Sequence, residues 1–150
     1  MDKLEKIITI EGNPKPLKRH YHTKTGKTFD PSSEDKKLFA LQAIGQIHSK
    51  MPFKGDICLT LRFYMKRPKS HYRTGKLSRI LKDTAPVYHK VKPDISNLIK
   101  FVEDALIGIC YKDYSQIVKI DAEKKYILDY DDIPRTRLMI KEIKCMNQLR

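Results

Sequence analysis

The residues best suited to chemistry lie in one segment, KPDISNLIKFVEDALIGICYKDYSQIVKIDAE. Within it, Asn97, Lys100 and Asp104 are separated by three and four residues, which places them on one face of a helix. Asp94 stands where that helix would begin, and Asp113 follows in a turn. Carboxylate oxygens are the ligands that Mg²⁺ prefers, and a bound ion activates water and stabilises the leaving oxygen of a phosphodiester. A lysine beside such a site would neutralise charge in the transition state.

The same residues also have a purely structural interpretation. Asp94 would cap the helix, and Lys100 would form an i,i+4 pair with Asp104 worth about 0.2–0.5 kcal/mol. Turns favour aspartate, which would account for Asp113. Spacing alone therefore leaves the chemical and the structural interpretations open.

Hydrophobic patterning predicts the elements that position these residues. Strands are expected over residues 5–11, 55–65, 117–127 and 137–143, and helices over residues 32–49 and 95–107. The clearest strand signal is one apolar set in strict alternation: Ile57, Leu59, Leu61, Phe63 and Met65. Residues 12–31 are expected to form an irregular basic loop, and residues 66–92 a long, mobile basic loop.

Each predicted helix has an apolar face. In the first helix this face is expected to contain Ala40, Ile44 and Ile47, and in the second it contains Leu98, Val102, Ala105 and Leu106. These elements predict one α/β (α+β) domain over residues 1–150, with a small mixed sheet and two helices. Their order is strand, helix, strand, long basic loop, helix, strand, strand.

The charge of the chain is large and unevenly distributed. The 150 residues contain 31 Lys+Arg and 18 Asp+Glu, a formal net charge of +13. Residues 1–93 hold 21 of these bases and only 8 of the acids. A clustered excess of this kind favours binding to a nucleic acid, because each neutralised phosphate releases counterions.

Basic residues in two segments are the predicted contacts with the DNA backbone: Lys15, Lys18, Arg19, Lys66, Arg67, Lys69, Arg73 and Lys76. Several aromatic residues lie within or near basic segments, where bases can stack on their rings: Tyr21, Phe29, Tyr64, Tyr72 and Tyr88. We expect no contact with a membrane, because no apolar run approaches the roughly 20 residues that span a bilayer. We also expect no small-molecule substrate. Three widely spaced cysteines without a Cys-x-x-Cys pair, and a start without an apolar signal region, predict a reducing, cytoplasmic setting.

The segment KPDISNLIKFVEDALIGICYKDYSQI resembles the signature of the RusA family of Holliday junction resolvases, which reads roughly KPDxDNLxKxxxDALxGxxYxDDxQI. The opening ITIEGNPKP, the later KTFDPS and the basic run before KPD extend the similarity over about residues 5–143. The resemblance implies a small homodimeric α/β nuclease of DNA recombination and repair. Such nucleases use Mg²⁺ to cut four-way DNA junctions by paired nicks, and many are encoded by phages or prophages.

The resemblance also implies roles for individual residues. Asp94 matches a metal-binding acid of the family, and Lys100 matches its catalytic lysine. Ser96 and Tyr114 stand where the family has two further metal-binding acids. We expect Asp113 to serve as a substitute metal ligand, Asp104 to support Lys100, and Asn97 to lie beside them without touching the ion.

Three functions remain open at this point. The first is a magnesium-dependent junction endonuclease. The second is a junction-binding protein whose catalysis is weakened or lost, because a serine hydroxyl is a poor magnesium ligand and tyrosine stays protonated near neutral pH. The third is a basic RNA-binding protein that needs no metal.

Overall fold

The computed structural model describes residues 5–47 and 51–143. Its main sheet has the strand order β1-β6-β4-β5, in which β4 and β5 are parallel and the other neighbours are antiparallel. The main elements are β1 (Glu5–Glu11), α1 (Ser33–Ile44), β4 (Asp56–Met65), α2 (Ile95–Leu106), β5 (Ile117–Tyr126) and β6 (Arg135–Ile143). The mixed α+β fold and the order of these elements were predicted correctly. The structure adds a small two-stranded sheet and three short 3₁₀ helices to them.

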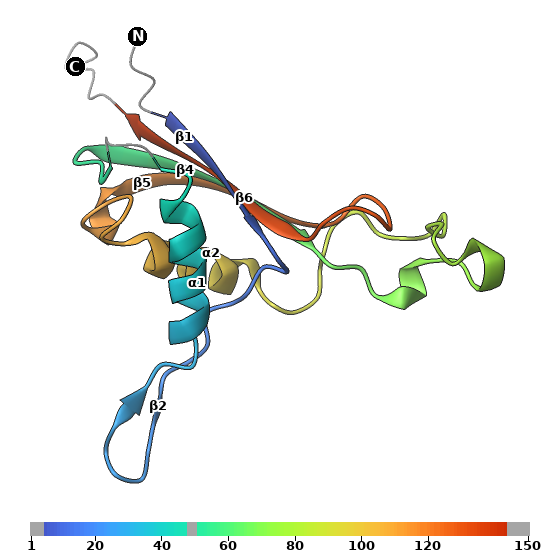
Figure 1. Ribbon diagram of the computed structural model, residues 1–150, viewed down its shortest axis with the longest axis horizontal. Helices are drawn as coiled ribbons and strands as arrows, with labels where there is room; N and C mark the ends of the chain where they lie inside the picture. The colour runs from blue at the N-terminus through green and yellow to red at the C-terminus, as the bar shows by residue number, and fades with distance from the viewer. Residues whose placement is uncertain (1–4, 48–50, 144–150) are drawn as a thin grey trace.

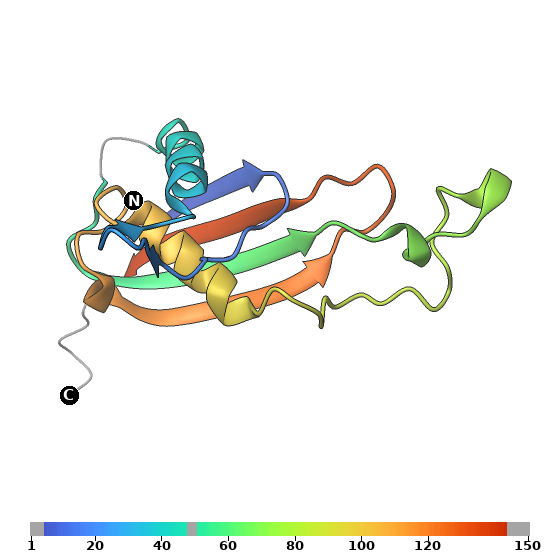
Figure 2. The same ribbon diagram turned by 90° about the horizontal axis from the view of Figure 1, so that it is seen from below.

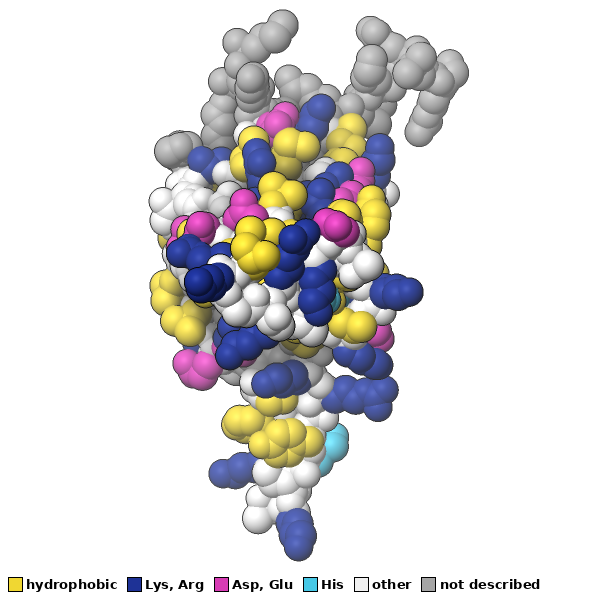
Figure 3. Space-filling view, turned by 90° about the vertical axis from the view of Figure 1, so that its right-hand side faces the viewer, with side chains coloured by type: hydrophobic (Ala, Val, Ile, Leu, Met, Phe, Trp, Pro, Cys, Tyr) yellow, Lys and Arg dark blue, Asp and Glu magenta, His cyan; other side chains and the backbone are white. Residues whose placement is uncertain are grey.

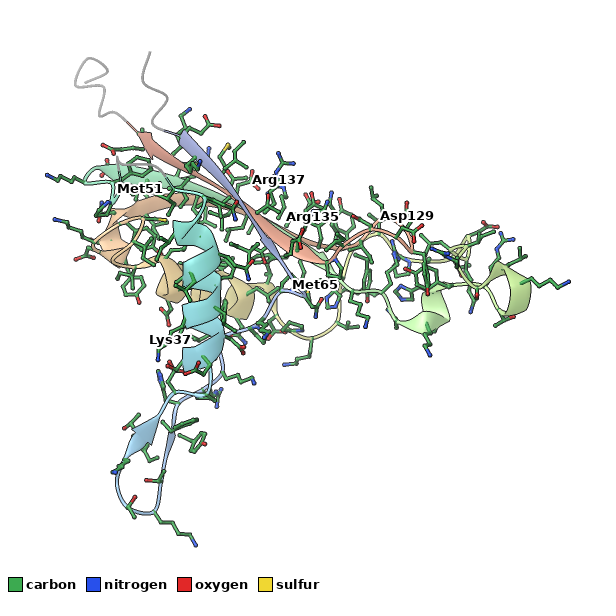
Figure 4. All side chains as sticks on the ribbon, viewed as in Figure 1. Lys37, Met51, Met65, Asp129, Arg135 and Arg137 are labelled. Carbon is green, nitrogen blue, oxygen red and sulfur yellow. The ribbon has the colours of Figure 1, made fainter. Side chains whose placement is uncertain are left out.

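The hydrophobic core lies between one face of the main sheet and the two helices. The inward residues of β4 are the predicted alternating set, each at most 2% exposed: Ile57, Leu59, Leu61, Phe63 and Met65. Figures 1 and 2 show α1 and α2 on the same side of the sheet. An edge-to-face contact between Phe39 of α1 and Phe101 of α2, with ring centroids 5.7 Å apart, joins the helices. The opposite face of the sheet carries polar side chains, among them Arg137 (Figure 4).

Helix α2 lies in the crossover that connects the parallel strands β4 and β5. Its predicted apolar stripe is buried, with Phe101 added to it. The chain leaves the helix through Gly108, whose φ of +81° is readily adopted only by glycine. Because α2 follows β4 and precedes β5, it runs back along the sheet, and its amino end lies near the carboxyl ends of both strands.

The arm (residues 66–92) projects from the sheet where β4 ends at Met65, and returns to the start of α2 (Figures 1 and 4). It contains two 3₁₀ turns, η1 (Lys69–His71) and η2 (Gly75–Leu77). Backbone hydrogen bonds from Arg73 to Ile80 and from Lys82 to His71 pair its outgoing and returning strands. The predicted loop therefore has regular internal contacts, and its mobility stays a prediction.

The hairpin (residues 18–29) forms the second projection seen in Figure 1, where its tip points away from the sheet. It pairs β2 (Tyr21–His22) with β3 (Thr28–Phe29), and its turn is closed by hydrogen bonds between Thr23 and Lys27. The prediction of a wholly irregular loop over residues 12–31 was wrong here, because the strands are too short to show a period in the sequence.

Helix α1 is shorter than predicted and buries a different face. It ends at Ile44, before Gly45, which is a poor helix former; the predicted end at Ser49 lies outside the described residues. Its buried side chains are Phe39 and Ala43, whereas Ile44 is 51% exposed. The predicted face of Ala40, Ile44 and Ile47 was therefore wrong. In the described part of the chain, no helix has the length and apolar character needed to cross a membrane.

Candidate active site and nucleic-acid interface

Asp94 is the N-cap residue of helix α2, but its carboxylate does not bond to the backbone amides of the first turn. The backbone carbonyl of Asp94 accepts hydrogen bonds from the amides of Asn97 and Leu98, at 3.1 and 3.2 Å. Its side chain makes no capping hydrogen bond and is 57% exposed. One carboxylate oxygen lies 3.7 Å from the amine of Lys92. The carboxylate is therefore open to solvent and to a ligand, and the predicted side-chain cap is not formed.

Lys124 of β5 supports this end of the helix, and sequence analysis did not single it out. Its amine donates hydrogen bonds to the carbonyls of Val91 and Pro93, at 2.8 and 2.6 Å. Burial lowers the pKa of Lys124, while the nearby charge of Asp94 acts in the opposite direction. The residue thus ties the returning arm to the sheet and fixes the approach to Asp94. The sequence signal that could have identified Lys124 is its inward position in β5, where it alternates with Ala122 and Tyr126.

The next turns of α2 carry Ser96, Asn97 and Lys100. Ser96 and Lys100 are exposed. Among the described residues, no carboxylate lies within 4.0 Å of the Lys100 amine. The carbonyl of Asn97 accepts a hydrogen bond of 3.0 Å from the amide of Leu17, which holds the base of the hairpin against α2. The amino end of α2 thus lies between the bases of the hairpin and the arm.

Asp113 lies beyond the opposite end of α2 and serves as a structural cap. It precedes the 3₁₀ helix η3 (Tyr114–Gln116), and its carboxylate accepts a 2.8 Å hydrogen bond from the amide of Ser115. This hydrogen bond lowers the pKa of Asp113. The Gln116 side chain accepts from the amide of Asp113 at 2.9 Å, completing a capping box.

Asp104 is also engaged at the carboxyl end of α2. Its carboxylate accepts a 2.8 Å hydrogen bond from the hydroxyl of Tyr114 and lies 3.8 Å from the amine of Lys36. Burial, reinforced by this hydrogen bond, raises the pKa of Tyr114 to about 12, so the phenol stays neutral. The prediction that Asp104 supports Lys100 was wrong, because the carboxylate turns to Tyr114 and Lys36 instead.

The two acids expected to share a metal ion are not brought together within one chain. Asp94 and Asp113 flank opposite ends of a helix of 12 residues, and a helix rises about 1.5 Å per residue, so its ends are roughly 18 Å apart. Within residues 5–47 and 51–143, no three His, Cys, Asp or Glu side chains are grouped to hold a metal ion. A metal at this site would therefore take Asp94 without Asp113 of the same chain.

Comparison with known proteins identifies the family. The sequence model described as "Endodeoxyribonuclease RusA" matches residues 11–141, most of the chain. The chain belongs to the RusA endodeoxyribonuclease family. It is also 32% identical over 89 residues to "Uncharacterized protein YqaN" of Bacillus subtilis (strain 168). That alignment covers 59% of this chain and 59% of the Bacillus protein.

The basic residues predicted to contact DNA are mostly exposed in this RusA-family chain. The exposed ones are Lys15, Lys18, Arg19, Lys66, Lys69, Arg73 and Lys76. Lys15 pairs with Asp35 at 2.7 Å, and Arg73 lies 3.5 Å from Asp83. Figure 3 shows Lys and Arg side chains over the arm and along the hairpin. Both projections of the fold therefore present positive charge.

Arg67 is the exception among these residues and has a structural role. It is only 8% exposed, and its guanidinium donates to the carbonyls of Ile127 and Pro86, each at 2.7 Å. The guanidinium also lies over the ring of Tyr126, 5.1 Å from its centroid. These contacts fasten the base of the arm to the end of β5. These internal contacts give Arg67 a structural role, and its contact with DNA stays a prediction.

Proposed function

We propose that this RusA-family protein binds four-way DNA junctions as a homodimer and nicks them with Mg²⁺, using Asp94 and Lys100. The observation that carries the proposal is the exposure of both side chains, Asp94 at the start of α2 and Lys100 within its amino-terminal half, between two basic projections. The amino end of a helix favours phosphate. The projections supply the charge that binds the DNA backbone.

The donor set at Asp94 fits a magnesium ion of the kind that takes one or two protein carboxylates and completes its shell with water and substrate phosphate. Bound there, the ion would activate water and stabilise the leaving oxygen. Lys100 would stabilise the negative charge that develops on the phosphate. Lys124 would act only as a positioning residue, because it holds the backbone on either side of Lys92.

The homodimer follows from the symmetry of the substrate. A four-way junction has two-fold symmetry, and paired nicks require two equivalent active sites. Light scattering on the purified protein tests this part directly, and the mass of a single chain in the presence and absence of junction DNA would contradict it.

Cleavage is expected to be slow, because Ser96 supplies no second negative charge beside Asp94. The test incubates end-labelled junction with protein over a range of Mg²⁺ concentrations. We expect symmetric nicks at high Mg²⁺ that the Asp94→Asn variant does not make. A Ser96→Asp variant places a second carboxylate two residues from Asp94 and is expected to nick faster and at lower Mg²⁺, whereas Tyr114→Asp, beyond the far end of α2, is expected to leave the rate unchanged. These single variants show which position limits the rate.

A second candidate function is junction binding without cleavage. It is favoured by the hydrogen bond from Tyr114 to Asp104, which engages both side chains within the protein. Tight junction binding with no nicks at any Mg²⁺ concentration, and nicks only in the Ser96→Asp variant, would select this function. Preference for structured RNA over the junction at one fixed salt concentration would reject both candidates, since salt alone shifts non-specific binding.

A further inference from the structure

Two aromatic rings lie side by side in the middle of the hairpin. Tyr21 and Phe29 are directly opposite each other in the register of β2 and β3. Their ring centroids are 5.0 Å apart and their planes are inclined by 43°. The residues are 52% and 50% exposed, so about half of their surface faces solvent. A cross-strand aromatic pair helps a short hairpin to form, but this role does not use the exposed surface.

The rings are surrounded by positive charge. Residues 18–29 contain four Lys+Arg and no Asp or Glu. Asp30 follows them in the sequence. Its carboxylate forms an ion pair with the amine of Lys36 at 2.6 Å and lies 3.5 Å from the ring of His20. The space-filling view shows hydrophobic side chains on the projecting hairpin with Lys and Arg beside them (Figure 3). Flat apolar surface set among cations is the combination that holds single-stranded nucleic acid.

The hairpin is held at a fixed place relative to α2. The amide of Leu17 bonds to the carbonyl of Asn97, and the amide of Lys18 donates to the hydroxyl of the buried Ser32 at 2.9 Å. Tyr21 lies four positions after Leu17, which corresponds to about 13 Å of extended chain. The rings therefore lie on the hairpin, beyond its contact with Asn97 in the first turn of α2.

We propose that Tyr21 and Phe29 stack on an unpaired base at the branch point of the DNA. This inference rests on the proposed function and deepens it, because it assigns a base-binding site to the hairpin, whose base contacts the first turn of α2. Backbone contacts from the basic residues would bind paired and unpaired DNA alike. The ring pair would add affinity only where a base is free to leave its stack.

The test compares three DNAs of matched length, a four-way junction, a duplex and a single strand, without divalent cations so that no strand is cut. A Tyr21→Val/Phe29→Val variant removes the flat rings and keeps high strand propensity. We expect it to bind the junction and the single strand roughly 5- to 150-fold more weakly, the range for losing one stacked base. Duplex affinity is expected to change by less than about twofold.

Two further variants serve as controls. Tyr21→Phe keeps the ring and is expected to retain wild-type affinity for all three DNAs. Lys24→Ala/Lys27→Ala keeps both rings and is expected to weaken binding to all three, with a salt dependence shallower by about two charges. In the wild type, 5-iodouracil at the branch point should crosslink on irradiation to the peptide that contains Tyr21 or Phe29.

Either of two outcomes would overturn the stacking proposal: no loss of affinity in the double valine variant, or an equal loss on duplex and single strand. Failure of the proposed function is distinguishable from both. If the wild type neither prefers nor nicks junctions, but the double valine variant binds the single strand more weakly than the wild type does, junction recognition is rejected and the stacking site is retained.

Discussion

The carboxylates before and after the middle of helix α2 differ in their partners. Asp94, at the start of the helix, and Lys100 face solvent, whereas Asp104 and Asp113, at and beyond its carboxyl end, form hydrogen bonds within the protein. Asp94 forms no capping hydrogen bond with its side chain. Asp113 caps η3, and Asp104 accepts a hydrogen bond from Tyr114. A carboxylate that already holds amides or a phenol must give up those partners before it binds a metal. Residue type and spacing therefore do not distinguish a ligand from a cap, but the hydrogen-bond partners do.

The largest expected difference between the two ends concerns Mg²⁺-dependent cleavage. Asp94→Asn removes the charge that would hold the ion, so we expect the rate of junction nicking to fall by roughly 100-fold or more. Asp113→Asn removes a charge far from that point and keeps an oxygen that accepts the capping hydrogen bond, so the rate is expected to stay within about twofold. Single-turnover cleavage of a labelled junction, at saturating protein, measures both rates.

Thermal unfolding provides the matching control for this pair. The Asp113→Asn variant should unfold at a lower temperature than the wild type, because the lowered pKa of Asp113 reports a carboxylate stabilised by the Ser115 amide. That stabilisation is present above the unfolded pKa of about 3.9 and is lost as the pH falls through the lower folded pKa. Equal loss of cleavage in both variants, with neither unfolded, would place Asp113 in the active site and break the comparison.

A smaller contrast is expected between two exposed lysines, Lys100 within α2 and Lys112 in the segment that follows it. Each alanine variant removes one positive charge, so long-range attraction to DNA changes alike. Lys100→Ala is expected to slow cleavage by roughly 10- to 100-fold, because it also removes charge stabilisation at the reacting phosphate. Lys112→Ala should leave the single-turnover rate within about twofold. Comparable slowing in both variants would show that Lys100 acts only through net charge.

The parts of the fold that were predictable are those with a local period. The alternation from Ile57 to Met65 and the stripe of α2 from Leu98 to Leu106 each bury one face, so the sequence carries their period directly. The end of α1 and its buried face depend on how the helix packs against β1. The side chain of Gln46, for example, bonds the backbone of Thr9, a partner 37 residues away.

The candidate site was predictable in part for the same reason. The placement of Asp94 and Lys100 on α2 follows from helical spacing. The burial of Arg67 does not, because its partners Ile127 and Pro86 are distant in the sequence. The separation of Asp94 from Asp113 could have been anticipated from the length of the helix between them, since a straight helix keeps its ends apart.

The smallest expected effect concerns stability at the carboxyl end of α2. Tyr114→Phe removes the hydroxyl that donates to Asp104, so the free energy of unfolding should fall by about 0.5–1 kcal/mol, the low end for a hydrogen bond at a partly exposed site. Ser96→Ala at the amino end forms the control. It is exposed, and we expect a change within about 0.5 kcal/mol. Urea denaturation at pH 8 measures both values.

The pH dependence of this difference tests its cause. The pKa of Tyr114 is raised to about 12 in the folded protein, first by burial and then by the bond to Asp104. Because the folded pKa lies above the unfolded value of about 10, the protonated phenol stabilises the fold fully below pH 10. That contribution is lost as the pH rises through about 12. The wild type and the Tyr114→Phe variant should therefore converge in stability between these pH values. A difference that persists unchanged through that range would mean that it does not come from the hydrogen bond that the protonated hydroxyl donates to Asp104.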